Sequence, residues 1–331
     1  MHDTFRALIA RKSDDGYTVS IEELNQSDLP AGGEVLVEVA CSSLNYKDGL
    51  AVTARGKIIR RFPMVLGIDL AGTVVSSASS EFQPGDRVLA TGQGLGETDW
   101  GGYAGMQRVR ADALVPIPAA LSFQQGMAIG TAGLTAMLCV MALDHAGIRP
   151  DEREVVVTGA GGGVGSIAVM LLARRGYKVA ASTGRAEIEP WLRGLGASSI
   201  VPREDLARKP SALESERWAG AVDTIGGLTL ATLLAQTVYE GAVAACGMAG
   251  GAELSTTVFP LILRNVALLG VSSLRTPKET RLAAWSALAH ELDLSVLDAS
   301  CRIEPLSRIR ELSEEILAGK TRGRVVIDVR G

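Results

Sequence analysis

The sequence is poor in the residues on which nucleic-acid-binding proteins depend. Aromatic residues make up 4% of the chain, and the 33 lysines and arginines are outnumbered by 37 aspartates and glutamates. A slightly acidic chain with few aromatic rings has neither the positive field nor the stacking surfaces that nucleic acid requires. We therefore expect no nucleic-acid partner.

Residues that bind metals are also few. The chain has three histidines and four cysteines, and Cys41, Cys139, Cys246 and Cys301 are widely separated. No HExxH or CxxC pair occurs, so we expect neither a metal site nor a disulfide framework. We interpret each cysteine as a small buried hydrophobic residue.

Membrane-directing segments are not evident either. Residues 1–16 lack the apolar stretch and the small-residue cleavage site of a secretory signal. Residues 113–143 carry no charge, but prolines, glutamines and glycines interrupt them, and no run reaches about 20 consecutive apolar residues. The sequence therefore predicts a buried helix here, no membrane partner and a cytoplasmic location.

What is present indicates an α/β protein. A length of 331 residues with 47% hydrophobic residues predicts a globular chain of about two domains. Residues 1 to 120 alternate with period two between Gly and Pro turns, which indicates a β-rich first third. From residue 122, short apolar strands alternate with helical segments, which predicts a doubly wound parallel sheet. Residues 306–319 read as an amphipathic helix and 324–329 as a strand, and we expect both to return to the first domain.

The most informative stretch is EVVVTGAGGGVGSIAVMLLARR, residues 154–175. An apolar strand leads into a glycine-rich turn, and an amphipathic helix follows at once. This context is that of a dinucleotide-binding loop, although its regular glycines, Gly159, Gly162 and Gly165, are spaced as GxxGxxG. Backbone N–H groups at such a turn, with the positive end of the helix, suit a pyrophosphate.

The end of the next strand favours NADPH as the cofactor. An NAD-preferring site has an acidic residue about twenty positions after the glycines, and this chain has Thr183, Gly184 and Arg185 there. A guanidinium presents a planar fork to the oxygens of a 2′-phosphate. The alternative is that Arg185 is an ordinary solvated residue opening the next helix.

Five segments carry a resemblance to a known family. They are SSLNYKD at 42–48, GKIIRRFPMVLGIDLAGTV at 56–74, GTAGLTAMLCVMAL at 130–143, VVVTGAGGGVGS at 155–166 and AACGMAGG at 244–251. Together, over essentially the whole chain, they resemble the NADPH-dependent acrylyl-CoA reductase family in the zinc-free quinone-oxidoreductase branch of the medium-chain dehydrogenases/reductases.

This resemblance implies a GroES-like β-rich catalytic domain, residues 1–124 and 300–331, and a Rossmann NADP-binding domain, residues 125–299. Zinc-bearing relatives have GHE where this chain has Gly67-Ile68-Asp69, so the resemblance implies hydride transfer without a metal. The cofactor contacts it implies are Tyr46, Gly161, Gly162, Gly163, Val164, Thr183, Gly184, Arg185, Arg203, Met248, Ile262, Ser273 and Arg324.

The function expected from the resemblance is reduction of the 2,3 double bond of a short enoyl-CoA, from acryloyl-CoA to propionyl-CoA. We predict Tyr46, in a loop that Asn45 and Asp48 fix, as the catalytic residue; alternatively its ring only packs against the nicotinamide and solvent donates the proton. Asn45, Thr131 and Arg60 are the predicted substrate residues. The alternatives are that Thr131 only caps a helix and that the basic run around Arg60 is a solvated loop.

The sequence leaves two other functions open and predicts a homodimer. The rivals are an NADPH-dependent quinone reductase, because fold does not determine substrate, and an NADPH-binding protein without turnover. Residues 266–274 read as an apolar strand at the end of the sheet, and an unpaired edge of that kind predicts a homodimer.

Overall fold

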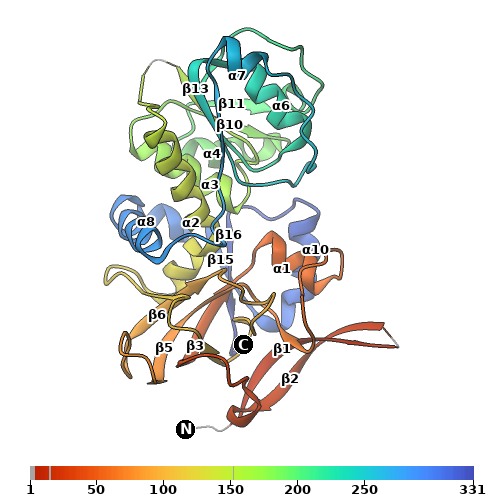
Figure 1. The fold of residues 1–331 in the computed structure, drawn as a ribbon, viewed down its shortest axis with the longest axis vertical. Helices are drawn as coiled ribbons and strands as arrows, with labels where there is room; N and C mark the ends of the chain where they lie inside the picture. Colours follow the sequence, from red (N-terminus) through yellow and green to blue (C-terminus); the bar gives the residue numbers. More distant parts are fainter. Residues whose placement is uncertain (1–3, 15, 152) are drawn as a thin grey trace. The chain divides into compact units, whose positions relative to one another are not determined.

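The computed structural model describes residues 4–14, 16–151 and 153–331, and the chain forms two compact units (Figure 1). The first unit holds the described residues of Met1–Leu134, Ser273–Ala289 and Leu294–Gly331, and the second holds Thr135–Ser272 and His290–Asp293. The domain boundaries predicted after residues 124 and 299 stay a prediction.

The first unit is rich in strands. These are β1 (Thr4–Ser13), β2 (Gly16–Asn25), β3 (Val35–Ser43), β4 (Met64–Val65), β5 (Asp69–Ser77), β6 (Arg87–Thr91), β7 (Met106–Val109), β8 (Leu114–Pro116), β15 (Cys301–Pro305) and β16 (Arg324–Asp328). Its helices are α1 (Tyr46–Val52), α8 (Lys278–Glu291), α9 (Leu294–Ala299) and α10 (Ile309–Leu317), with 3-10 turns η1 (Gln26–Asp28) and η3 (Leu306–Arg308). The last two residues of α8 belong to the second unit.

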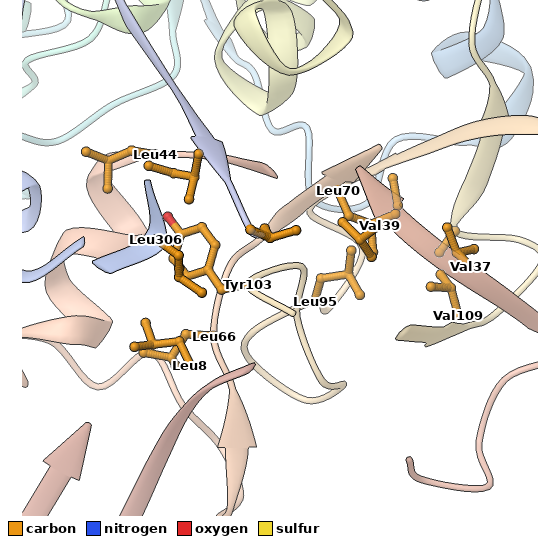
Figure 2. Close-up of a cluster of buried hydrophobic side chains, with 14 of the residues drawn as sticks. Leu8, Val37, Val39, Leu44, Leu66, Leu70, Leu95, Tyr103, Val109 and Leu306 are labelled. Carbon is orange, nitrogen blue, oxygen red and sulfur yellow. The ribbon is translucent and has the colours of Figure 1, made fainter. Parts of the chain in front are cut away.

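Two sheets organise this unit. The smaller has the order β2-β1-β4, and the larger has the order β15-β16-β3-β5-β6-β8, with β7 also paired to β3. The predicted return of the C-terminal segment is confirmed, because β16 pairs antiparallel with β3, with Val326 opposite Ser43. Figure 2 shows the core that this return completes, in which Leu306 lies beside the ring of Tyr103.

The second unit alternates strands and helices. Its strands are β9 (Glu154–Val157), β10 (Val179–Thr183), β11 (Ser199–Pro202), β12 (Trp218–Asp223), β13 (Thr237–Ala245) and β14 (Ala267–Gly270). Its helices are α3 (Gly163–Arg174), α4 (Glu189–Gly194), α5 (Arg203–Leu206), α6 (Gly227–Gln236) and α7 (Phe259–Leu263), with the 3-10 turn η2 (Ala186–Ile188).

These strands form one sheet in the order β11-β10-β9-β12-β13-β14, and every pair is parallel. In order of appearance this is 3-2-1-4-5-6, the doubly wound order of dinucleotide-binding sheets. The sequence explains it, since β9 and β10 are apolar runs buried on both faces, as strands between helices must be. The predicted parallel sheet is confirmed.

The uncharged stretch is the helix α2 (Phe123–His145), which contains the boundary between the units at Leu134. By length and composition it is long and apolar enough to cross a membrane, yet 78% of its most apolar window is buried inside the protein. Gly130 interrupts the helix with φ 51° and ψ −159°. The predicted buried helix is confirmed, with a kink at Gly130 that the sequence did not indicate.

Candidate active site

The glycine loop follows β9 in the second unit and begins with a left-handed turn. Gly159 has a φ of 58°, and a Cβ there would lie 2.4 Å from Oγ1 of Thr224. A Cβ at Gly165, in the first turn of α3, would lie 2.3 Å from the carbonyl oxygen of Gly159. Glycine is therefore required at both positions, first for the backbone conformation and then for the close contact of helix and loop.

The helix α3 begins at Gly163, directly after this loop, with Gly162 as its N-cap residue. Among the described residues, a Cβ at Gly162 would meet only the carbonyl oxygen of Gly159 within 4 Å, at 3.3 Å. The first backbone N–H groups of a helix, here including those of Gly163 and Val164, have no partner within the helix. An open glycine surface beside such groups fits the diphosphate of a dinucleotide.

Two guanidinium groups lie at the carboxyl end of β10. Nη2 of Arg185 donates to the carbonyl oxygen of Gly161 at 3.3 Å. A Cβ at Gly184 would lie 2.8 Å from both Nε and Cζ of Arg203, so that guanidinium packs directly on the glycine. The backbone N–H of Arg185 donates to Oγ1 of Thr183 at 3.1 Å. The structure thus brings together five of the residues predicted to bind the cofactor, and their donors suit a phosphate monoester.

Buried polar residues close the carboxyl ends of β9 and β12, where the strand order reverses. Oδ1 of Asp223 accepts from Oγ1 of Thr158 at 2.6 Å, and Oδ2 accepts from the backbone N–H of Gly226 at 2.8 Å. Burial raises the pKa of this carboxyl. Oγ1 of Thr224 donates to the carbonyl oxygen of Thr158 at 3.0 Å. These bonds hold the two loops at the edge where ligands of this fold bind.

Three residues that the resemblance assigns to the cofactor lie in different places. They are Met248, Ile262 and Ser273. Met248 follows β13 at its carboxyl end and is 69% exposed. Ile262 belongs to α7, which precedes β14 and so lies toward the amino ends of the strands. Ser273 belongs to the first unit, where its carbonyl oxygen accepts from Nε2 of Gln93 at 3.2 Å. Of the three, Met248 lies at the same edge of the sheet as the glycine loop, and the cofactor contacts of all three stay predictions.

In the first unit, Tyr46 is the first residue of α1 and is 44% exposed. The prediction of a loop here is wrong, because Asn45 and Asp48 form a capping box that starts a short helix. The backbone N–H of Asn45 donates to Oδ2 of Asp48 at 2.9 Å, and that of Ile68 donates to Oδ1 at 2.9 Å. Burial, together with the charge of Asp69, raises the pKa of Asp48 to about 7. Asn45 and Asp48 thus hold the backbone that carries Tyr46.

Asp69, the first residue of β5, is the centre of a buried polar cluster. Its Oδ2 accepts from Oγ of Ser43 at 2.6 Å and from Nδ2 of Asn45 at 2.9 Å. The backbone N–H of Thr131 donates to Oδ2 at 2.9 Å, and Oγ1 of Thr131 donates to Oδ1 at 2.5 Å. The structure therefore joins two of the predicted substrate residues, Asn45 and Thr131, through one carboxylate.

Arg324 completes this cluster from β16. It is 3% exposed, and burial lowers the pKa of its guanidinium. Nε donates to the carbonyl oxygen of Ala128 at 2.7 Å, and Nη2 donates to Oγ of Ser43 at 3.1 Å and Oδ1 of Asn45 at 3.4 Å. Arg324 therefore supports Asn45 and α2, and its predicted contact with the cofactor stays a prediction.

Gly130 allows the side chains of the Asp69 cluster to pack against the backbone of α2. A Cβ there would lie 2.7 Å from Oδ2 of Asp69, 2.9 Å from Oγ of Ser43 and 3.0 Å from Nη2 of Arg324. Glycine is required here for two reasons, because φ is positive and because there is no space for a Cβ. The kink of α2 thus directs the backbone N–H of Thr131 toward Asp69.

The basic run near Arg60 is partly neutralised. Arg55 and Arg61 each form an ion pair with an acidic side chain, at 2.8 and 3.4 Å. Lys57 and Arg60 are exposed, and in the part of the chain that the structure describes neither has an ion-pair partner. Two such cations on an exposed loop suit phosphate groups. The predicted substrate role of Arg60 stays a prediction.

No group of three or more His, Cys, Asp or Glu side chains that could hold a metal ion occurs within residues 4–14, 16–151 and 153–331. Cys41 and Cys139 are buried, and Cys246 and Cys301 are half-buried. Burial raises the pKa of Cys41 to about 12, which makes that thiol inert.

The sequence analysis missed the residues that organise the site. In the first unit, Asp69 was considered only as part of the segment that replaces the GHE of zinc-bearing relatives, and Ser43 and Gly130 were given no role. In the second unit, Thr158 and Asp223 were given no role. A charged residue at one end of an otherwise apolar strand was the available signal for both carboxylates, because Asp69 is the first residue of β5 and Asp223 is the last residue of β12.

Comparisons with known proteins agree with this architecture. The family model for the alcohol dehydrogenase GroES-like domain matches residues 31–119, and the model named zinc-binding dehydrogenase matches residues 163–289. "Probable acrylyl-CoA reductase AcuI" of Escherichia coli (strain K12) is 49% identical over 324 residues, covering 98% of this chain and 99% of that one. "Acrylyl-CoA reductase AcuI" of Ruegeria pomeroyi is 48% identical over 330 residues, with coverage of 98% and 99%. The chain belongs to the acrylyl-CoA reductase family.

Other members of this oxidoreductase superfamily are equally complete matches. "Putative quinone oxidoreductase YhfP" of Bacillus subtilis is 44% identical, covering 99% of each chain. The solved structure of the yhdH oxidoreductase from Salmonella enterica, in complex with NADP, has a TM-score of 0.95 and 50% identity, with coverage of 98% and 99%. That of Bacillus subtilis yhfP, with NAD bound, has a TM-score of 0.94 and 44% identity, with the same coverage. The predicted combination of a GroES-like unit and a Rossmann sheet is confirmed.

Proposed function

We propose that the protein is an NADPH-dependent reductase of the 2,3 double bond of short enoyl-CoA thioesters, converting acryloyl-CoA to propionyl-CoA. The observation that carries this proposal is the match, over 98% of the chain, to two proteins named acrylyl-CoA reductase. The glycine loop of the second unit supports the proposal, because its geometry suits the diphosphate of a dinucleotide.

NADPH rather than NADH is the proposed cofactor. Arg185 follows Gly184 in the chain, and the guanidinium of Arg203 packs on Gly184. Thr183 stands where an NAD-preferring site has an acidic residue that would hydrogen-bond a free 2′-hydroxyl. Charge-assisted bonds from guanidinium to phosphate are about twice as strong as neutral hydrogen bonds. These bonds are available only to the 2′-phosphate, so they favour NADPH.

The reaction adds two hydrogens across a carbon–carbon double bond. When bound, NADPH supplies the hydride, which the β-carbon accepts because the thioester carbonyl withdraws electrons from it. The chain must then stabilise the negative charge that develops on the carbonyl oxygen and deliver a proton to the α-carbon. In this proposal Tyr46, which is exposed at the start of α1 on a backbone held by Asp48, presents its hydroxyl for one of these tasks.

The coenzyme A portion is proposed to use the exposed loop that carries Lys57 and Arg60. Coenzyme A has three phosphates, and each unpaired cation near them adds a screened but favourable interaction. Asn45 was predicted to contact the substrate. In this proposal it instead supports the backbone of Tyr46, because both the oxygen and the nitrogen of its amide are hydrogen-bonded within the Asp69 cluster.

Quinone reduction is the second candidate, because the 44% identical relative from Bacillus subtilis is named a quinone oxidoreductase. Steady-state oxidation of NADPH with acryloyl-CoA and with a small quinone, at equal cofactor concentration, separates the two. Turnover with the thioester alone, or far higher kcat/KM for it, supports the proposal. Fast turnover with the quinone and none with the thioester would refute it.

The remaining alternative is an NADPH-binding protein without turnover. Calorimetric binding of NADPH, combined with no oxidation in the presence of any enoyl thioester, would favour that alternative. Tyr46→Phe tests the catalytic assignment in the active protein. Loss of one transition-state donor costs about 10²-fold in kcat, whereas an unchanged kcat would leave Tyr46 with a packing role.

The proposed assembly is a cytoplasmic homodimer joined through the second unit. β14 is at the end of its sheet, and a groove of about 880 Å³ beside it is lined by Leu268 and Leu269. Exposed apolar side chains of the same unit are Tyr239, Val258, Phe259, Ile262 and Leu263. An open strand edge with nearby apolar surface favours symmetric pairing with a second copy. A monomer in light scattering at micromolar concentration would refute this assembly.

A further inference from the structure

One side chain of the first unit contacts both ends of the loop between α1 and β4, residues 53–63, which we call the basic loop. Tyr17, in β2, donates its hydroxyl proton to the carbonyl oxygen of Ala51 in the last turn of α1, at 2.5 Å. Its ring meets that of Phe62 edge to face, with 5.9 Å between the centroids and 84° between the planes. Tyr17 therefore contacts the chain just before the basic loop begins and again where it ends.

The middle of the basic loop is fixed by other contacts. Ile58 and Ile59 are partly buried and pack against the hydrophobic core of the first unit. The backbone N–H of Arg60 donates to the carbonyl oxygen of Glu97 at 2.9 Å. Lys57 and Arg60, on either side of the two isoleucines, are exposed. The two cations thus face solvent from a backbone that internal contacts hold.

Both contacts of Tyr17 restrict movement of the basic loop. Tyr17 is half-buried, and burial raises the pKa of its hydroxyl to about 12, so the hydroxyl keeps its proton at neutral pH. Carbonyl groups in the last turn of a helix have no partner within the helix, and a hydroxyl donor there stabilises the end of α1. The edge-to-face geometry with Phe62 is one that aromatic rings favour. A loop that is already ordered loses less conformational freedom when it binds a ligand.

We propose that Tyr17 is a positioning residue that holds the basic loop in the arrangement that recognises the phosphates of a coenzyme A thioester. The inference rests on the proposed function, in which Lys57 and Arg60 bind those phosphates. Tyr17 acts on the substrate only through these two cations. It therefore favours coenzyme A thioesters over thioesters that carry the same acyl group without phosphates.

The test compares two thioesters with the same reacting group. Acryloyl-CoA carries the phosphates, and acryloyl-pantetheine lacks them. Tyr17→Phe removes the hydroxyl and keeps the ring, and kcat/KM is measured for both thioesters at saturating NADPH. Loss of one hydrogen bond predicts that the ratio of kcat/KM for acryloyl-CoA to kcat/KM for acryloyl-pantetheine falls about 2- to 12-fold. A general defect in folding or hydride transfer would lower both values equally and leave the ratio unchanged.

Two further variants test how Tyr17 acts. Phe62→Leu removes the ring contact but keeps the hydroxyl bond, and it should lower the same ratio. The double variant Lys57→Ala, Arg60→Ala should also lower the ratio. In that background Tyr17→Phe should have no further effect on it, because the cations through which Tyr17 acts are gone.

Tyr177→Phe is the matched control. The hydroxyl of Tyr177 donates to the carbonyl oxygen of Ile148 at 2.8 Å, within the second unit, and burial raises its pKa to about 12 as well. This variant loses the same kind of bond and should leave the ratio unchanged. An unchanged ratio in Tyr17→Phe would overturn the inference. A full effect of Tyr17→Phe in the Lys57→Ala, Arg60→Ala background would overturn it too.

Failure of the proposed function is distinguishable from failure of this inference. Wild-type protein that does not turn over acryloyl-CoA refutes the function. In that case calorimetric binding of coenzyme A to the wild type and to Tyr17→Phe replaces the kinetic ratio. Weaker binding to Tyr17→Phe supports the inference, whereas equal binding, or no binding to the wild type, overturns it.

Discussion

Replacing Arg203 with alanine should abolish most of the preference for NADPH over NADH. Its guanidinium lies on Gly184 at the end of β10, and in the described part of the chain it has no ion-pair partner. The substitution therefore removes a cation without leaving a buried partner unpaired. The effect should be confined to ligands that carry a 2′-phosphate.

The magnitude follows from one charge-assisted hydrogen bond. Such a bond is worth about 1.5–3 kcal/mol, and each 1.36 kcal/mol corresponds to a factor of ten. Arg203→Ala should thus lower kcat/KM for NADPH by about 12- to 160-fold and leave kcat/KM for NADH within about twofold. Both values are measured with acryloyl-CoA at saturation.

Gly184→Ala offers a second perturbation that retains every charge. The backbone of Gly184 lies outside the left-handed region, but an added Cβ would lie 2.8 Å from Nε and Cζ of Arg203 and must displace that guanidinium. We expect a smaller loss in the same direction. Arg193→Ala is the control, because Arg193 pairs with Glu189 on the surface of α4 at 2.9 Å and should not affect cofactor choice. Equal losses for NADPH and NADH in Arg203→Ala, or a wild type that uses both equally, would refute the reasoning.

Three further predictions concern stability and metals. Gly130→Ala should lower the free energy of unfolding by about 2–4 kcal/mol in chemical denaturation, because φ is 51° and the Cβ would lie 2.7 Å from Asp69; Gly126→Ala in the same helix, with its nearest contact at 3.7 Å, should be neutral or stabilising. The folded protein binds the proton of Asp48 more tightly than the unfolded chain does, since burial raises that pKa from 3.8 to about 7. Stability measured by thermal unfolding should therefore fall as the pH rises from about 4 to about 7, and Asp48→Asn should reduce that fall; an identical pH profile in both proteins would contradict the assignment. Turnover of acryloyl-CoA should be unchanged after dialysis against a strong chelator, and a loss restored by Zn²⁺ would contradict a metal-free reaction.

The parallel sheet of the second unit was predictable because its signals are local. EVVV is buried on both faces, and the glycines that follow it must be glycines for reasons of backbone conformation and contact within about ten residues. The alternation of strands and helices predicts parallel pairing with constrained connections, whereas the strand order β11-β10-β9-β12-β13-β14 comes from the structure. The return of the C-terminal helix and strand to the first unit was also predictable, because they lack partners of their own, but the pairing of β16 with β3 was not predicted.

The Asp69 cluster was not predictable from spacing. Ser43, Asp69, Gly130 and Arg324 come from four separate parts of the chain and meet only after the first unit has folded. A buried carboxylate is recognised by the donors around it, and those donors are distant in sequence. The start of α1 is a different case, because the capping box of Asn45 and Asp48 is a local signal, and it predicts a helix rather than a loop at Tyr46.

Transfer of a labelled hydride tests the central claim most directly. The protein is incubated with acryloyl-CoA and NADPH deuterated at the transferable position of the nicotinamide, and the acyl product is examined by mass spectrometry and NMR. The proposed reaction predicts propionyl-CoA with one deuterium, located on the β-carbon, because that carbon accepts the hydride and solvent or Tyr46 supplies the α-proton. Propionyl-CoA without deuterium on the β-carbon, or no propionyl-CoA under conditions in which a quinone is reduced, would contradict the proposed function.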